Sequence, residues 1–254
     1  MTLPRTPSFR LDGRRALVVG ASSGIGTAAA VALAEQGAEV WLAARRQAEL
    51  QALVTEMQTA GFRAHALPLD ITDVAATETA LSALPAFDIL VNSAGIARHG
   101  PAIDTTPDDF DFAVGLNFRA AYFVTRSVAR RLLAEDKPGS LINISSQMAH
   151  VGGVDRAVYA ATKHALEGMT KSMAIEWGPH AIRVNTIAPT FIRTALTTAT
   201  FANPERAAWI ASKIKLARVG EVEDLMGAIA FLASDAASLI TGTSLIVDGG
   251  WTAD

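Results

Sequence analysis

The sequence contains no cysteine. This absence excludes disulfide bonds, thiolate-bound metal sites and a cysteine nucleophile. Histidine is scarce as well: the chain has five, and none belongs to an H-E-x-x-H motif or to a similar ligand spacing. We therefore predict that the protein holds no catalytic metal.

Long apolar runs are also missing. The longest, such as AAAVALA and AIAFLA, are much shorter than a membrane span. Residues 1–10 lack the apolar segment of a signal peptide, so we expect a loose N-terminal lead-in and a cytoplasmic protein. The formal net charge is only -3, with acidic and basic residues mixed along the chain. This balance favours a small-molecule substrate over a nucleic acid or a membrane as partner.

The chain does contain a regular alternation of apolar and helical segments. Apolar segments predict strands at 15–20, 38–44, 64–70, 88–94, 139–145, 182–188 and 244–250. Amphipathic or alanine-rich segments predict helices at 25–36, 46–60, 73–84, 108–135, 158–177, 205–216 and 222–233. Strands that are apolar throughout suit a sheet covered on both faces. We therefore predict one α/β domain over 1–254, a doubly wound Rossmann-type three-layer sandwich with a seven-stranded parallel sheet.

A glycine-rich segment, GASSGIG, follows the first predicted strand and opens the first predicted helix. Gly20, Gly24 and Gly26 would expose backbone N–H groups at a helix N-terminus, which favours a pyrophosphate. The same letters fit G-x-S-x-G, the nucleophile elbow of a hydrolase, with Ser22 as nucleophile. A hydrolase is disfavoured, because only 19 residues precede the motif and no histidine follows His180.

The second predicted strand ends in AARR. In dinucleotide-binding folds an acidic residue here binds the ribose 2'-hydroxyl, but this chain has Ala44, followed by Arg45 and Arg46. The planar donors of an arginine suit a 2'-phosphate. The sequence therefore predicts NADP(H) as the preferred cofactor, with NAD(H) possible.

The motif YAATK places Tyr159 and Lys163 four residues apart in a predicted helix. Both side chains then stand on one face, about one turn apart. Taken alone, a solvated pair on a surface helix explains this motif equally well.

Eight motifs that follow one another in order favour a functional role for this pair. They are GASSGIG (20–26), LDITD (69–73), NSAG (92–95), LN ending at Asn117, NISS (143–146), YAATK (159–163), RVNTIAP (183–189) and VDGG (247–250). With these motifs the chain resembles the short-chain dehydrogenase/reductase (SDR) family from about residue 10 to 250. The resemblance implies hydride transfer between a nicotinamide cofactor and a carbonyl or secondary alcohol.

The resemblance also implies the catalytic set Asn117, Ser146, Tyr159 and Lys163. Tyr159 would exchange a proton with the substrate oxygen, and the Lys163 ammonium, together with an oxidised nicotinamide, would lower the phenol pKa. Ser146 would hydrogen-bond the substrate, Asn117 would hold a relay water, and Ser145 would be structural.

For the cofactor, the resemblance implies a cleft that uses Tyr159 and Lys163 again. Its other members would be Gly20, Ser22, Ser23, Gly24, Ile25, Gly26, Arg45, Arg46, Asp70, Ile71, Asn92, Ala94, Gly95, Pro189, Thr190, Ile192 and Thr194. A structural role is the alternative for Asn92. One departure from the family pattern is Thr190, because Pro-Gly is usual at 189–190.

Segments 147–158 and 190–214 are expected to line the substrate pocket. His150 and Arg156, close in sequence to Ser146 and Tyr159, suggest a sugar acid, a polyol or a similar polar substrate. A surface-loop position is the alternative for His150. The competing functions are a 3-oxoacyl-thioester reductase of the same family and a non-catalytic dinucleotide-binding sensor. Relatives of this kind pair long helices across subunits, so a homotetramer is expected.

Overall fold

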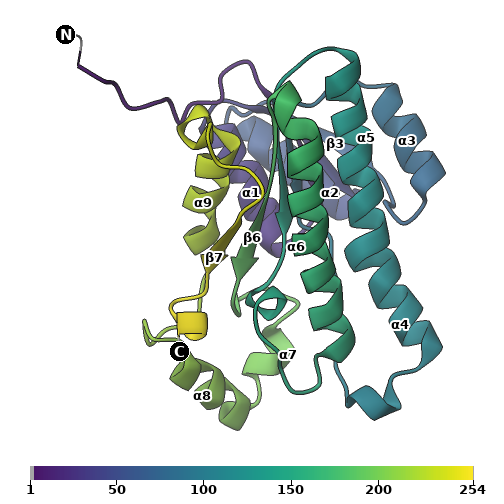
Figure 1. The fold of residues 1–254 in the computed structure, drawn as a ribbon, viewed down its shortest axis with the longest axis vertical. Helices are drawn as coiled ribbons and strands as arrows, with labels where there is room; N and C mark the ends of the chain where they lie inside the picture. Colours follow the sequence, from purple (N-terminus) through teal and green to yellow (C-terminus); the bar gives the residue numbers. More distant parts are fainter. Residues whose placement is uncertain (1–2, 254) are drawn as a thin grey trace.

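The computed structural model describes residues 3–253 (Figure 1). It contains the predicted seven-stranded parallel sheet. The strands are β1 (Arg15–Val19), β2 (Glu39–Ala44), β3 (Ala64–Pro68), β4 (Ile89–Asn92), β5 (Gly139–Ile144), β6 (Ile182–Pro189) and β7 (Ser244–Val247). Their order across the sheet is β3-β2-β1-β4-β5-β6-β7, with every neighbouring pair parallel. The Rossmann-type α/β prediction is confirmed. The single-domain prediction stays a prediction, although all seven strands belong to one sheet.

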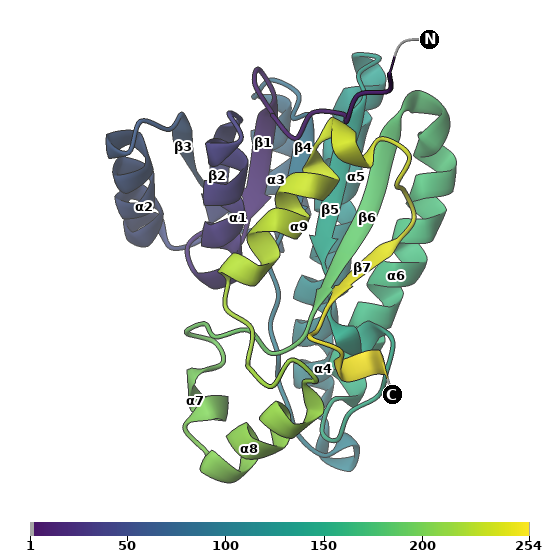
Figure 2. The same ribbon diagram turned by 90° about the vertical axis from the view of Figure 1, so that its left-hand side faces the viewer.

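Helices cover both faces of this sheet, as Figure 2 shows. One face carries α1 (Gly24–Glu35), α2 (Gln47–Thr59) and α9 (Glu223–Ala233). The other carries α3 (Val74–Ser82), α5 (Ala121–Ala134) and α6 (Ala157–Trp177). Strand β1 shows why the strands are apolar throughout, because Val18 points into the first core and Leu17 into the second. Both are fully buried.

The strand order changes direction at β1. This strand pairs with β2 on one side and with β4 on the other, so the chain leaves β1 in one direction and later returns to its opposite edge. In open α/β sheets, a crevice forms beyond the carboxyl ends of the strands at such a switch point. The glycine-rich segment after β1 and the segment after β4 both lie there.

The predicted helix at 108–135 is interrupted in the structure. Helix α4 (Pro107–Val114) begins at the N-cap Thr106, whose hydroxyl accepts a hydrogen bond from the Asp109 N–H. A π-helical stretch, η2 (Gly115–Ala120), then separates α4 from α5. Wide turns of this kind often mark functional sites in helices. Asn117 lies inside the stretch.

The connection after β6 holds two helices at the carboxyl end of the sheet, α7 (Thr198–Phe201) and α8 (Pro204–Lys213) (Figure 1). Only α8 was predicted, and it ends three residues before the predicted end. Short 3-10 helices are η1 (Ala102–Asp104), η3 (Gln147–Ala149), η4 (Gly178–His180), η5 (Asp235–Ala237) and η6 (Trp251–Ala253).

The N-terminal lead-in has no helix or strand over residues 3–10, and these residues are exposed. The Phe9 ring contacts the Phe231 ring of α9, with 6.2 Å between the ring centroids. Residues 1 and 2 lie outside the described part of the chain. Within residues 3–253, no helix combines the length and the apolar character that crossing a membrane requires.

Candidate active site

The glycine-rich turn after β1 is shaped for close backbone approach. Gly20 has φ +76, and a β-carbon there would lie 2.7 Å from the Ala94 nitrogen. A β-carbon on Gly26 would overlap the Gly20 carbonyl oxygen, so Gly26 closes the turn and does not line the cleft. Helix α1 starts here without a side-chain cap and without an acidic residue in its first turn. Its free N–H groups and its dipole favour an anion.

A cleft of about 390 Å³ extends from this turn along the ends of β1, β2 and β4. Arg46 donates two 3.0 Å hydrogen bonds across the cleft, to the hydroxyls of Ser22 and Ser23. Arg45 is more exposed, and its Nη1 lies 4.0 Å from the Asp70 carboxylate. Most of the predicted cofactor residues line the cleft: Gly20, Ser22, Ser23, Gly24, Ile25, Arg45, Arg46, Asp70, Ile71, Ala94, Gly95 and Thr194.

Asn92 is buried at the end of β4. It lines neither this cleft nor the smaller cavity that adjoins the cleft. Its amide donates to Asn143 at 3.0 Å and accepts from the Ala94 N–H at 3.2 Å. Asn92 therefore holds the chain that follows β4, which is the structural alternative considered for it.

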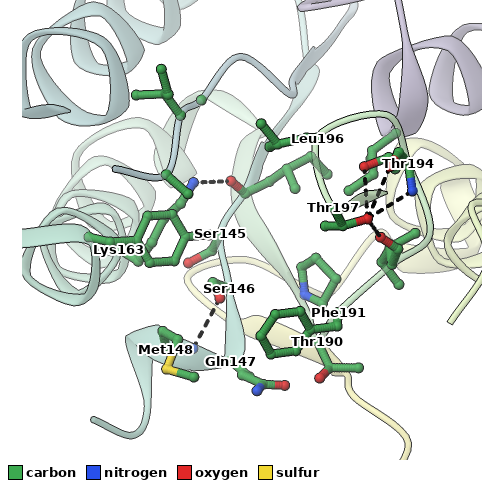
Figure 3. Close-up of a pocket in the computed structure, with 18 of the residues that line it drawn as sticks. Ser145, Ser146, Gln147, Met148, Lys163, Thr190, Phe191, Thr194, Leu196 and Thr197 are labelled. Carbon is green, nitrogen blue, oxygen red and sulfur yellow. Dashed lines mark hydrogen bonds between the residues drawn. The ribbon is translucent and has the colours of Figure 1, made fainter. Parts of the chain in front are cut away.

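A second cavity, of about 210 Å³, adjoins this cleft (Figure 3). The two spaces share six lining residues, Ile25, Ser93, Gly95, Ile96, Thr194 and Leu196. Thr194 also contacts the glycine-rich turn, because its methyl carbon would lie 3.1 Å from a β-carbon on Gly24. One elongated ligand therefore fits the turn, the cleft and the cavity together. Pro189, Thr190 and Ile192 line the cavity, as do Ser146, Tyr159 and Lys163.

The structure brings Tyr159 and Lys163 together on the first turns of α6. The Lys163 Nζ lies 5.7 Å from the centre of the Tyr159 ring and donates a 2.9 Å hydrogen bond to the Ile144 carbonyl oxygen. Burial lowers the pKa of the Lys163 ammonium to about 8, although the carboxylate of Glu167 acts in the opposite direction. Lys163 has no carboxylate within ion-pair distance among the described residues. Its remaining N–H groups are therefore available to hydroxyls of a ligand.

Tyr159 departs from one expectation. Burial raises the pKa of its phenol above the ordinary value of 10.0, while the Ser146 hydroxyl and the Arg156 guanidinium act against this rise. The surrounding protein groups therefore keep the phenol protonated at neutral pH, as a proton donor to a carbonyl oxygen requires.

The two adjacent serines differ in their hydrogen bonds. Ser146 caps η3, and its hydroxyl accepts from the Met148 N–H at 3.1 Å (Figure 3). Its own proton stays available to the phenol or to a substrate. Ser145, expected to be structural, is buried and lines the same cavity, but its hydroxyl has no protein partner.

Asn117 does not line the cavity. Its buried amide donates to the Ile96 carbonyl oxygen at 2.9 Å and to Thr162 at 3.2 Å, and accepts from the Ile96 N–H at 2.8 Å. The amide therefore clamps the segment after β4 to α6. These contacts leave the amide little capacity for the relay water expected from the resemblance. They fix Gly95 beside the Lys163 ammonium.

The two residues predicted for the substrate are placed differently. Arg156 lines the cavity, whereas His150 lies outside it and its Nε2 lies 2.9 Å from the Ser244 hydroxyl of β7. His99, which the motifs did not identify, lines the cavity and meets the Tyr159 ring edge-on at 5.7 Å. Its position in the long loop after β4 was the available signal, because loops at the carboxyl ends of strands surround such sites.

Four residues that line this cavity each have a buried polar side-chain atom with no hydrogen-bond partner in the described part of the protein. They are Ser145, Gln147, Arg156 and Thr190. Buried polar groups are normally paired, so their clustering points to a ligand rich in hydrogen-bonding groups. Within residues 3–253 no group of three His, Cys, Asp or Glu side chains is arranged to hold a metal.

Comparison with known proteins gives this arrangement a family. A family model described as "Enoyl-(Acyl carrier protein) reductase", which belongs to the short-chain dehydrogenases/reductases, matches residues 20–252. The chain belongs to the short-chain dehydrogenase/reductase family. As an SDR protein, it is an NAD(P)-dependent oxidoreductase that acts on CH–OH groups.

Three similar proteins indicate where the chain stands among SDR enzymes. D-erythrulose reductase of Gallus gallus is 41% identical over 96% of this chain and 98% of its own. Gluconate 5-dehydrogenase of Gluconobacter oxydans is 37% identical over 96% of each chain. The crystal structure of a gluconate 5-dehydrogenase from Burkholderia cenocepacia in complex with NADP and tartrate has a TM-score of 0.94 and 36% identity. The match covers 97% of this chain and 98% of the Burkholderia chain.

Proposed function

We propose that this protein transfers hydride between NADP(H) and a carbonyl or secondary alcohol of a small polyhydroxylated compound, such as a polyol or a sugar acid. The observation that carries the proposal is the cluster of unpartnered polar atoms beside Tyr159, Ser146 and Lys163. The similar proteins named for D-erythrulose and gluconate support the same substrate class.

The larger cleft fits a dinucleotide with a 2'-phosphate. The glycine-rich turn and the uncapped start of α1 suit the pyrophosphate. Arg45 and Arg46 put two cationic side chains at the end of β2, with the serine hydroxyls of the turn in reach of Arg46. Among residues 3–253, Asp70 is the only acidic residue that lines this cleft. Its carboxylate lies 4.0 Å from Arg45 and accepts hydrogen bonds from the Thr72 N–H and hydroxyl. The NADP bound to the similar Burkholderia enzyme supports the same cofactor.

The protein's own groups supply the proton chemistry. A bound nicotinamide would supply or accept the hydride. Tyr159 donates its phenol proton to the carbonyl oxygen during reduction and takes it back during oxidation. Ser146 hydrogen-bonds the same oxygen and orients it. Lys163 uses its free N–H groups to hold ribose hydroxyls and offsets the negative charge that forms on Tyr159.

The shape of the cavity favours a small polar substrate over a 3-oxoacyl thioester. About 210 Å³ suits a molecule of the size of a sugar acid, and a long acyl chain would leave the buried polar atoms unpaired. A non-catalytic dinucleotide sensor does not need these atoms or the phenol in the same cavity. Measurable turnover therefore distinguishes an enzyme from a non-catalytic sensor.

The test is NADPH oxidation with polyol-derived ketones, keto acids of the sugar series and 3-oxoacyl thioesters, for the wild type and for Tyr159→Phe. We expect the wild type to reduce a polar ketone and the variant to lose at least about a thousandfold in kcat while binding NADPH normally. Tyr122→Phe, on the exposed face of α5, is the matched control and should keep full activity. Retained turnover in Tyr159→Phe would refute the assignment, and tight NADPH binding without any turnover by the wild type would favour the sensor.

We also propose that the protein is a cytoplasmic homotetramer. The support is the set of partly exposed apolar side chains on α4, α5 and α6, namely Phe112, Tyr122, Leu133 and Ile175, the last of them 78% exposed. Light scattering of the purified protein tests the stoichiometry. A monomer at micromolar concentration would exclude it.

A further inference from the structure

Arg156 is a buried cation without a counterion. Only two cationic side chains line the smaller cavity within the described residues, Lys163 and Arg156, and no acidic side chain lines it. Arg156 is 5% exposed, and neither a hydrogen bond nor an ion pair from its guanidinium to residues 3–253 is present. Its Nη1 is fully buried. Burying an unpaired charge is costly, so a protein keeps such a group only where something compensates it.

The surroundings of Arg156 hold it in place without neutralising it. Its guanidinium carbon lies 6.0 Å from the centre of the Phe191 ring, and its aliphatic stem packs against Gly153, where a β-carbon would approach within 3.0 Å. Its backbone carbonyl accepts the Ala160 N–H at 2.7 Å at the start of α6. Burial, helped by the positive charge of Arg206, lowers the pKa of the guanidinium to about 10. The nearby charge is thus of the same sign and adds to the demand for an anion.

The position of Arg156 relative to the reacting group is also fixed. It lies three residues before Tyr159 on the same helix terminus, and both side chains face the same small cavity. A substrate whose oxygen meets Tyr159 and Ser146 therefore reaches Arg156 with another part of the same molecule. Gln147 and Thr190 also line this cavity, and each has a buried polar side-chain atom without a protein partner.

From this arrangement, and resting on the proposed function, we propose that Arg156 binds a carboxylate of the substrate, which is therefore a sugar acid or a related hydroxy or keto acid and not a neutral sugar or polyol. The planar guanidinium offers two parallel N–H donors to the two oxygens of a carboxylate. This contact neutralises the buried charge and fixes the distance from the acid group to the reacting carbon. Arg156 acts as a binding residue in this scheme, and Tyr159 remains the proton donor.

The test compares a keto acid of the sugar series, its methyl ester and a neutral ketose of the same length, all with NADPH. We expect the wild type to prefer the acid, and the ester to lose about as much kcat/KM as the ketose. Arg156→Met should lower kcat/KM for the acid by about 100-fold, mainly through KM, and change the ketose less than about threefold. Arg156→Lys should recover part of the loss. Arg63→Met, at an exposed position that lines neither the cavity nor the cleft, is the matched control and should leave kcat/KM for the acid unchanged.

Several outcomes would overturn the carboxylate contact. One is a wild-type enzyme that reduces the acid and its methyl ester equally well. This measurement needs no variant, so it does not depend on whether a variant folds. Another is an Arg156→Met enzyme that loses the same kcat/KM for the acid and for the ketose, because an equal loss means that Arg156 does not bind the carboxylate. A wild type that oxidises NADPH with none of these compounds would instead refute the proposed function.

A binding measurement supplies a second readout. The aldonic acid that forms when the keto acid is reduced can be titrated into the NADPH complex by calorimetry. Its Kd should rise about 100-fold in Arg156→Met and less in Arg156→Lys. Equal affinity of the wild type and Arg156→Met for this anion would contradict the proposal.

Discussion

Glu167 follows Lys163 by one turn of α6, and its carboxylate opposes the burial that lowers the pKa of the Lys163 ammonium to about 8. Both side chains are buried, at 7% and 4% exposure. The carboxylate of Glu167 accepts hydrogen bonds from Thr186 of β6 at 2.9 and 3.0 Å and from Ser244 of β7 at 3.3 Å. The last strands of the sheet therefore fix a negative charge near Lys163. Motif matching did not reveal this residue.

Glu167→Gln should change the pH dependence of kcat. Removing the negative charge lowers the pKa of Lys163 further, so less of the ammonium survives at pH 8. Because the ammonium is the active form, the fall of kcat with rising pH should move to lower pH, and kcat at pH 8 should drop about two- to fivefold. Glu176→Gln, at an exposed position on the same helix, is the control. A pH profile that moves to higher pH, or not at all, would contradict the role of Glu167.

Burial of Lys163 predicts a conflict between activity and stability. The unfolded lysine keeps a pKa near its ordinary value of 10.5, whereas the folded value is about 8. Between these values the unfolded chain holds more protons than the folded one, so wild-type stability rises with pH across this window. Below pH 8 the cost of the buried ammonium is fully present.

Lys163→Met should therefore raise the free energy of unfolding at pH 7 by about 1–2 kcal/mol, after the loss of the hydrogen bond to the Ile144 carbonyl. The gain should shrink as pH rises from 8 toward 10.5, while activity is absent throughout. Urea unfolding at pH 7 and pH 9.5 measures both effects. Lys171→Met, an exposed position on the same helix, is the control, and a variant less stable than the wild type at pH 7 would contradict the argument.

Arg46 is predicted to set the cofactor preference more than Arg45. Arg46 is held over the glycine-rich turn by Ser22 and Ser23, whereas Arg45 is 66% exposed and near Asp70. Arg46→Ala should raise the Kd of NADPH by about 10- to 100-fold and that of NADH less than threefold, since only NADPH carries the 2'-phosphate. Arg45→Ala should have the smaller effect. Fluorescence titration with both cofactors measures this, and an equal loss for NADH would assign Arg46 to the turn instead.

Local patterns predicted the parts of the fold that local physics controls. The seven strands came from apolar runs, and the runs are apolar because helices cover both sides of residues such as Leu17 and Val18. The glycine-rich turn was predictable because its backbone conformation and close backbone contacts require glycine. Gly20, for example, combines a positive φ with contact to the segment after β4.

Tertiary packing decided what the sequence left open. Nothing in the helical pattern at 108–135 indicated a π-helical stretch at Asn117, because the break depends on its bonds to Ile96 and Thr162. His150 is close to Ser146 in sequence but the turn of η3 directs it to β7. His99 reaches the cavity from a loop that has no motif. Neighbourhood in sequence was therefore a poor guide to the residues that line the cavity.

Thr190 stands where the family pattern usually has the glycine of Pro-Gly. Its hydroxyl is buried against the cavity without a protein partner, while its N–H donates to the Val247 carbonyl at 3.2 Å. Thr190→Val keeps the shape and replaces the hydroxyl by a methyl group. Because a buried unpaired hydroxyl is costly, the variant should be more stable by about 1 kcal/mol.

The same variant should bind the substrate less well. If the hydroxyl hydrogen-bonds a polyhydroxylated substrate, KM should rise about five- to tenfold, with the Kd of NADPH unchanged. Thr190→Ser keeps the hydroxyl and should keep the KM. Thermal unfolding without ligand and steady-state kinetics together separate the two effects. A raised Kd for NADPH in Thr190→Val, with KM unaffected, would place the hydroxyl against the cofactor, and the departure from glycine would then concern the nicotinamide end of the site.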